Sequence, residues 1–335
     1  MFKRKLLSVL LISILVLSGC GQTVYAPSFG ADESKKLVVY TAHKEEIYGP
    51  IIREFEDRTG IMVDVVTGGT NELLSMISEE SDSPKCDVMF GGGVDSLSAY
   101  TDLFYGYECS VSDKLFGDYR QKDDKYTVFS TFPIVFIYNQ KLVYSAGTPR
   151  TWHELLNNHW AGQIAFADPS KSGSAYTSLC TLIEITGDKY DRDEAIRLFA
   201  KNLKGELSSG SSKAVEEVVS GSKLIGITTE DIAKKYIMQG AQIGIVYPED
   251  GTSVLPDGTA IVNGAPHKDN AILFLEFTVS DDVQNLLQDY CYRHSVRKDI
   301  NVKSNVSAIE YDILWAEENR KEIIERLNET IGGEK

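Results

Sequence analysis

Short apolar strands alternate with amphipathic helices along most of the sequence, and this alternation restricts the fold more than any other feature. Residues 37–40 (LVVY) form an apolar run suited to a strand buried on both faces. Apolar residues at helical spacing follow this run and stop at Gly60. Two more strands are predicted at residues 61–66 and 87–90, with a second helix between them. Alternation of this kind predicts an α/β fold with a parallel sheet and helices on both sides.

A second set of alternating elements extends from residue 151 to residue 247. Residues 126–139 separate the two sets and contain two β-rich runs that meet at Pro133, long enough to cross from one domain to another. At 335 residues, the chain is long enough for two domains. We therefore predict two α/β lobes connected by extended segments.

The charge of the chain excludes two classes of partner. The formal net charge is −15, and the loss of a basic leader would make the folded part more acidic. Nucleic-acid binders and proteins that bind anionic membranes by charge need a basic face. The hydrophobic content of 42% is sufficient for a core in each lobe. We expect a soluble partner, and no nucleic acid.

The first residues predict export. Residues 1–19 have a basic start, an apolar stretch and an end of small residues, as a signal peptide has. The apolar stretch of residues 6–17 would rise only about 18 Å as a helix, too short for a bilayer core of roughly 30 Å. Residues 17–20 (LSGC) resemble the lipobox of bacterial lipoproteins. This resemblance implies a lipid anchor, with a diacylglyceryl group and palmitate, on Cys20. An ordinary cleaved signal is the alternative.

Residues 20–36 are rich in small and polar side chains and are predicted to tether the lipid to the folded part. The folded part would then work at the extracytoplasmic face of the cell membrane.

Enzyme and metal motifs were sought and none occurs. The sequence lacks G-x-S-x-G, H-E-x-x-H, G-x-x-x-x-G-K-[ST] and G-x-G-x-x-G, which carry hydrolase, protease and nucleotide chemistry. The cysteines show no C-x-x-C spacing, so a zinc site is not expected. We predict a protein without catalytic activity, cofactor or bound metal.

Small and polar turns recur where predicted strands end and helices begin. The first turns of helices leave backbone N–H groups unpaired and carry about half a positive charge, so several such turns around one cleft would bind an anion. The residues expected to contact this anion are Thr41, His43, Gly68, Gly69, Thr70, Gly92, Gly93, Ser172, Gly173 and Ser174.

Each of these turns alone also fits an ordinary role as a turn or cap. Residues 91–93 are harder to explain in this way, because three glycines in a row cost backbone entropy that a simple turn does not require. Two further turns follow predicted strands in the second set of elements. Their candidate ligand contacts are Thr229, Glu230, Tyr247 and Glu249, although Thr229 with the acids after it also fits a helix cap.

With these motifs placed, the chain resembles the extracellular solute-binding proteins of ABC importers, in the branch of ferric-ion, aminoethylphosphonate and hexose-phosphate binders. The resemblance covers about residues 37–287. Its most specific stretches are residues 59–63 (TGIMV), 68–74 (GGTNELL), 87–93 (DVMFGGG), 151–156 (TWHELL), 160–164 (WAGQI), 168–174 (DPSKSGS) and 247–252 (YPEDGT).

The resemblance implies a periplasmic-binding-protein fold of type II, in which two α/β lobes joined by extended crossovers close around a ligand. Lobe 1 is expected to contain residues 37–127 and about 252–290. Lobe 2 is expected to contain residues 128–251 and about 291–335. The family's partners would be a small anionic solute and the transmembrane subunits of a permease, with the receptor itself a monomer.

The ligand is expected to be a phosphorylated or phosphonate-bearing organic solute. Ferric-ion binders of this branch carry adjacent tyrosines in the second lobe, whereas this chain has Thr228 and Thr229 near that place and no Tyr-Tyr pair anywhere. Ferric ion, or another metal, remains the alternative ligand. A hydrolase and a surface adhesion module are rival functions from other classes.

Overall fold

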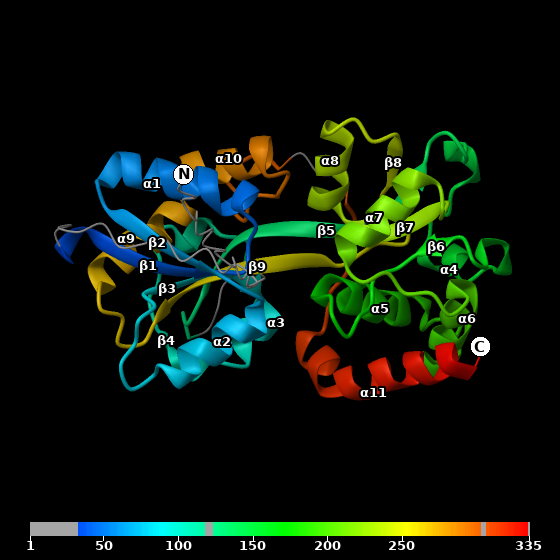
Figure 1. Cartoon of the computed structure of the whole chain (residues 1–335), viewed down its shortest axis with the longest axis horizontal. Coiled ribbons are helices and arrows are strands. Elements are labelled where there is room, and N and C mark those ends of the chain that lie inside the picture. The colour runs from blue at the N-terminus through cyan, green and yellow to red at the C-terminus, as the bar shows by residue number, and fades with distance from the viewer. Residues whose placement is uncertain (1–32, 118–122, 303–305, 334–335) are drawn as a thin grey trace, which may run out of the picture.

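The computed structural model describes residues 33–117, 123–302 and 306–333. Two lobes lie side by side, and two long strands run from one to the other (Figure 1). These strands are β5 (Thr127–Asn139) and β9 (Val254–Val262). In the part of the chain that the structure describes, no helix is long and apolar enough to cross a bilayer.

Each lobe is a layer of strands with helices packed against it. The elements of lobe 1 are β1 (Lys36–Thr41), α1 (Glu45–Thr59), β2 (Met62–Thr67), α2 (Thr70–Glu79), β3 (Val88–Gly93), α3 (Val94–Ser98), β4 (Phe104–Tyr105), α9 (Lys268–Thr278) and α10 (Asp281–Tyr290). Those of lobe 2 are α4 (Trp152–Leu155), β6 (Ile164–Ala165), α5 (Gly173–Thr186), α6 (Arg192–Leu203), α7 (Ser211–Ser220), β7 (Ile225–Thr229), α8 (Glu230–Met238), β8 (Ile243–Val246) and α11 (Ile313–Gly333).

The strands form one continuous sheet with the order β2-β1-β3-β9-β5-β7-β6. Strand β1 is parallel to β2 and to β3, and β6 is parallel to β7. Strands β5 and β9, however, are antiparallel to their neighbours. The parallel pairing predicted for the strands at residues 37–40, 61–66 and 87–90 is therefore confirmed. The sheet as a whole is mixed, because β9 enters lobe 1 from lobe 2 and runs against β3.

Strand β5 is unbroken, although the sequence suggested an interruption at Pro133. The residues before Pro133 pair with β9, and those after it pair with β7 and β8. Pro133 thus lies where β5 changes partners, so its missing N–H removes little from either ladder. The prediction that this segment crosses between lobes is confirmed.

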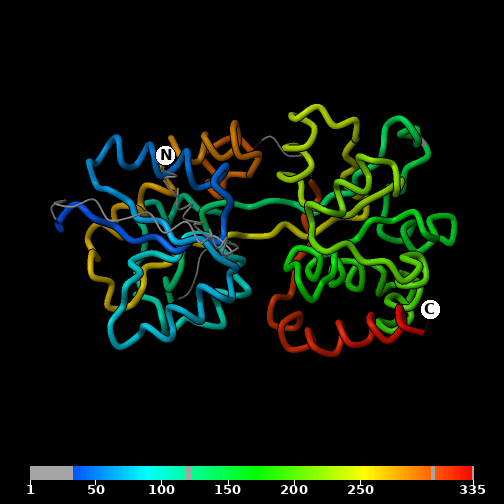
Figure 2. Tube along the Cα trace, in the orientation of Figure 1, coloured from blue at the N-terminus to red at the C-terminus, as the bar shows by residue number. Residues whose placement is uncertain are grey.

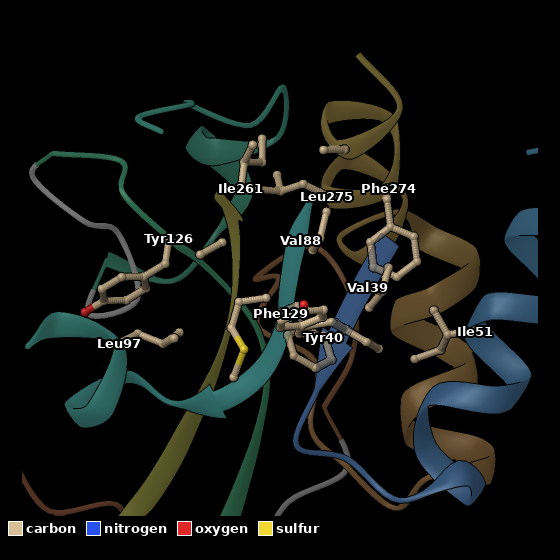
Figure 3. Close-up of a cluster of buried hydrophobic side chains, with 14 of the residues drawn as sticks. Val39, Tyr40, Ile51, Val88, Leu97, Tyr126, Phe129, Ile261, Phe274 and Leu275 are labelled. Carbon is tan, nitrogen blue, oxygen red and sulfur yellow. The ribbon is translucent and has the colours of Figure 1, made fainter. Parts of the chain in front are cut away.

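Each lobe has its own hydrophobic core. In lobe 1, Phe274 of α9 packs edge-on against Phe55 and Phe90, with ring centroids 5.1 and 5.2 Å apart. Figure 3 shows this core, with Phe274 and Leu275 facing the strands that carry Val39 and Val88. Helix α10 packs in the same cluster.

The core of lobe 2 gathers around Trp152, Phe136 and Phe166, and α11 packs against it through Ile323 and Leu327. Helix α11, drawn in red in Figure 2, lies along one side of lobe 2. Cys291 and Val296 lie in the lobe 1 cluster, beyond the boundary expected near residue 290. The exact lobe boundaries stay a prediction, since packing clusters alone do not define units that fold separately.

Candidate functional site

A cleft of about 850 Å³ lies between the two lobes. Lobe 1 contributes the turn after β1, the first residues of α2, the end of β3 and helix α3. Lobe 2 contributes the N-terminus of α5, the first residues of α8 and one side of α11. The floor consists of β9 residues and Arg293. The cleft therefore gathers segments that are far apart in the sequence.

Eight of the residues predicted to bind ligand line this cleft. They are His43, Gly69, Thr70, Gly92, Gly93, Gly173, Ser174 and Thr229. Six do not line it, namely Thr41, Gly68, Ser172, Glu230, Tyr247 and Glu249. Contact with a ligand stays a prediction for all of them.

The six outlying residues have other partners or lie just behind the cleft wall. Thr41 is buried and donates from Oγ1 to the carbonyl of Phe90 at 2.7 Å. The Tyr247 hydroxyl donates to the carboxylate of Glu230, which is itself almost fully buried. Glu249 accepts from Arg150 on an exposed surface. These contacts place Thr41, Glu230 and Tyr247 in supporting positions and Glu249 away from the cleft.

Ser172 belongs to a cluster of hydroxyl groups in lobe 2. Its Oγ lies 2.9 Å from Ser211 Oγ and 3.2 Å from Ser174 Oγ, and Ser174 and Ser211 are 3.1 Å apart. Ser172 is the N-cap of α5, where its Oγ accepts from the N–H of Ala175. Ser211 is the first residue of α7. Two helix N-termini therefore converge here, and their dipoles and hydroxyl donors favour negative charge.

Backbone donors in lobe 1 are partly in use already. The N–H of Gly92 donates to Asp257 Oδ1 at 2.7 Å, and the N–H of Gly69 donates to Glu72 Oε2 at 3.2 Å. Helix α3, which follows the three glycines, has only five residues. The lobe 1 turns thus offer an anion less than the sequence pattern suggested.

His43 is buried at the base of the lobe 1 turn. Its ring packs edge-on against Phe90 and Phe129, with centroids 5.2 and 5.7 Å away. Nε2 lies 3.3 Å from Asp257 Oδ2 but is too poorly aligned to form a hydrogen bond. Burial lowers the pKa of His43 to about 4, and the nearby Asp257 carboxylate opposes this shift only partly. The imidazole is therefore neutral at physiological pH.

Charged side chains that the sequence did not reveal form the cleft floor. The guanidinium of Arg293 pairs with the carboxylates of Asp257 and Asp231, and all three side chains are buried. No local motif marks these positions, because Asp257 lies within a strand and Arg293 in an irregular segment after α10. Ser211 was not among the residues expected to contact ligand, although Gly210 before it is a recognisable helix start.

Three further carboxylates line the cleft. They belong to Glu72 of α2, Asp95 of α3 and Glu317 of α11. Partial burial and the negative charge of Asp95 raise the pKa of Glu317. Two of these carboxylates, Glu72 and Asp95, belong to lobe 1 and lie across the cleft from the hydroxyl donors at helix N-termini in lobe 2.

Comparison with known proteins identifies the family. A family described as bacterial extracellular solute-binding protein matches residues 84–315, which is more than half of the chain. The chain belongs to this family. The solute-binding protein is also similar in structure to the periplasmic binding protein AfuA of Actinobacillus pleuropneumoniae, solved with fructose-6-phosphate bound. The TM-score is 0.76 at 22% identity, over 89% of this chain and 98% of that one. The predicted two-lobed fold is therefore confirmed.

Two relatives with different names are similar to the solute-binding protein in sequence. Iron uptake protein A1 of Synechocystis is 24% identical over 88% of this chain and 85% of its own length. A putative 2-aminoethylphosphonate-binding periplasmic protein of Salmonella typhimurium is 21% identical over 73% of each chain. The family places the protein outside the cytoplasm as a binder of solutes, and these names differ in the ligand they give.

Proposed function

We propose that the protein is the receptor of an ABC importer and captures a small organic phosphate or phosphonate outside the membrane. It acts as a monomer held to the membrane by a lipid on Cys20, a residue outside the described part of the chain. The receptor passes its ligand to the permease and performs no chemistry on it. Closure of both lobes around the ligand presents the loaded form.

The cluster of Ser172, Ser174 and Ser211 carries this proposal. A phosphoryl group has three strong acceptor oxygens, and the cluster supplies hydroxyl donors at the N-termini of two helices. These helices have 14 and 10 residues, long enough for developed dipoles. Lys171 also lines the cleft beside them. The phosphoryl group would bind lobe 2, and the organic part would face His43 and the carboxylates of lobe 1.

A ferric ion is the second candidate, and the relative named for iron uptake favours it. Two observations weigh against it. Tyr100 and Tyr311 are the tyrosines that line the cleft, and burial raises the pKa of Tyr311, which disfavours the phenolate that a ferric ion prefers. Among residues 33–117, 123–302 and 306–333, no group of three or more His, Cys, Asp or Glu side chains is arranged to hold a metal.

Calorimetric titration separates the two candidates. The purified protein is titrated with fructose-6-phosphate, 2-aminoethylphosphonate, inorganic phosphate and ferric citrate. We expect binding of at least one organic phosphate or phosphonate that is tighter than the binding of ferric citrate. Binding of ferric citrate alone would reverse the ranking, and release of inorganic phosphate from any ester would indicate an enzyme.

Serine variants then test the site itself. Replacement of Ser174 or Ser211 by Ala removes one donor to the anion and is expected to weaken binding by about tenfold. Ser220→Ala is the control, because Ser220 is an exposed residue at the far end of α7. Unchanged affinity in both Ser174→Ala and Ser211→Ala would place the anion elsewhere.

The lipid anchor has a separate test. In cells of the source organism grown with labelled palmitate, the wild-type protein is expected to carry the label and to sediment with membranes. Cys20→Ser is expected to lose both properties. Label retained by Cys20→Ser would show that lipid is attached at another residue, and absence of label from the wild-type protein would indicate an ordinary cleaved signal.

A further inference from the structure

Helix α8 of lobe 2 contacts lobe 1 through two acidic side chains and one basic side chain. Glu230 Oε2 lies 2.6 Å from Nε2 of His294, and Asp231 Oδ2 lies 3.2 Å from Nη2 of Arg293. One turn later, Lys235 Nζ lies 2.5 Å from Oε1 of Glu46 in α1. Figure 1 shows α8 at the edge of lobe 2 that faces α10. Separation of the lobes would break all three contacts.

Arg293 is the most enclosed of the lobe 1 partners. Its side chain is 6% exposed, and its guanidinium lies over the ring of Phe132 at 4.3 Å. Nη1 donates to Asp257 and also to Ser130 Oγ, at 3.2 Å from the latter. Asp257 and Ser130 are on the crossing strands β9 and β5. Because Arg293 has these two partners on the floor and only Asp231 on α8, it would stay with the floor if the lobes separated.

Both carboxylates that Arg293 holds also shape the cleft. Asp257 fixes the glycine turn of lobe 1 by accepting the Gly92 N–H. Asp231 is in the first turn of α8, two residues after the cleft-lining Thr229. A buried charge that loses its partner is strongly destabilised, so loss of the Arg293–Asp231 pair would disfavour separation of the lobes.

We infer that Arg293 is a positioning residue that holds α8 against the cleft floor. Closure of the lobes and the shape of the binding surface therefore depend on the same contacts. This role does not depend on which solute the cleft takes. It goes beyond the proposed function, which assigns the ligand to the serine cluster at the N-termini of α5 and α7.

The pKa of His43 reports on the contacts between Arg293 and the two carboxylates. The charged groups that act on its ring are Asp257 on β9, Arg293 after α10 and Asp231 on α8. Arg293 lowers the pKa of His43, whereas the two carboxylates raise it. Arg293→Gln should therefore raise this pKa above its value of about 4, and Asp231→Asn should lower it further. General loosening of the fold would expose the ring and raise the pKa in both variants.

The experiment measures lobe separation in the ligand-free protein. Spin labels are placed on Leu142→Cys of lobe 2 and Leu273→Cys of lobe 1, both at exposed positions, and their distance distribution is recorded by double electron–electron resonance. The four native cysteines in the described chain are buried thiols, which limits their labelling. The His43 pKa is followed by NMR in the same variants.

We expect Asp231→Asn to lower the ratio of closed to open forms by at least about tenfold relative to wild type. Asp231→Asn keeps the Arg293–Asp257 pair, so this variant folds and decides the test even if Arg293→Gln does not fold. Arg197→Gln is the matched control, since Arg197 pairs with Glu194 within α6. The inference is overturned if Asp231→Asn has the wild-type distance distribution, if Arg197→Gln opens the lobes equally, or if His43 shifts upward in Asp231→Asn.

Discussion

The pKa of His43 is determined by the burial of its ring and by the charges around it. The ring is enclosed by two phenylalanines and faces the Asp257 carboxylate, yet burial dominates and lowers its pKa from 6.5 to about 4. In the unfolded chain, His43 therefore becomes protonated as the pH falls through about 6.5. In the folded chain it becomes protonated only near pH 4. The contribution of neutral His43 to the free energy of unfolding is fully present above pH 6.5 and is lost as the pH falls from 6.5 to about 4.

We predict that acid weakens the protein through this residue. Between pH 6.5 and 4, the free energy of unfolding should fall by up to about 3 kcal/mol more in wild type than in His43→Gln, which cannot protonate. Urea unfolding at a series of pH values measures the difference. His159→Gln removes an exposed histidine and should retain the wild-type slope. A wild-type slope in His43→Gln would assign the acid sensitivity to other groups.

The backbone of Gly91 packs directly against the buried His43 ring. Its φ is +88°, and a Cβ there would lie 2.3 Å from His43 Nε2. The histidine ring cannot move aside, because Phe90 and Phe129 pack on it. The triple glycine therefore makes room for a buried side chain, in addition to any role in ligand approach.

We predict that Gly91→Ala lowers the free energy of unfolding by about 3 kcal/mol or more, through the positive φ and the overpacking together. Gly240→Ala provides the comparison, since Gly240 has a φ of +92° and open space around its Cβ position. This control should cost only about 1 kcal/mol. Equal losses in the two variants would show that φ alone is responsible.

At the scale of elements, the sequence predicts most of the strands and helices because their apolar spacing is local information. The strand at residues 37–40, the helix that ends at Gly60 and the strand at residues 61–66 all occur. What failed depends on partners distant in the chain. The continuity of β5 through Pro133 is set by pairing with β9 before this residue and with β7 and β8 after it, which no short segment encodes.

The candidate site divides in the same way. Ser172, Gly173 and Ser174 were found because they start a helix after a strand, a pattern with a local signature. Asp257 and Arg293 were missed because a strand residue and a loop residue become partners only in the folded chain. Local sequence patterns thus predicted residues at the rim of the cleft, whereas the charged residues of its floor were identified only from the structure.

Helix α11 gives a prediction at this scale. The helix covers the lobe 2 core with Leu327, which is fully buried, whereas Leu314 near its start is 72% exposed. Leu327→Ala should lower the free energy of unfolding by about 3 kcal/mol through the lost apolar contact and the cavity left behind. Leu314→Ala should change it by less than about 0.5 kcal/mol. Equal, small effects in denaturant unfolding would mean that α11 is detached from lobe 2.

For the whole molecule, the distribution of charge matters more than the net charge of −15. Hydroxyl donors and helix N-termini lie in lobe 2, carboxylates lie across the cleft from them, and ion pairs at α8 connect the lobes. An anion can therefore bind an acidic protein, because amide and hydroxyl donors act at contact range while distant charges are screened beyond about 10 Å. Charge also contributes to closure, since the α8 contacts to Arg293 and Glu46 are ion pairs.

The exposed member of these contacts predicts a salt effect on closure. Glu46 and Lys235 are 59% and 35% exposed, so their attraction is screened by salt, whereas the buried Arg293–Asp231 pair is not. With spin labels at positions 142 and 273, the ratio of closed to open forms should fall about threefold between roughly 10 and 500 mM NaCl. Glu46→Gln should have the lower ratio already at low salt and respond little to added salt. Glu54→Gln disrupts only a pair within α1 and should behave as wild type. A full salt response in Glu46→Gln would mean that other surface charges control closure.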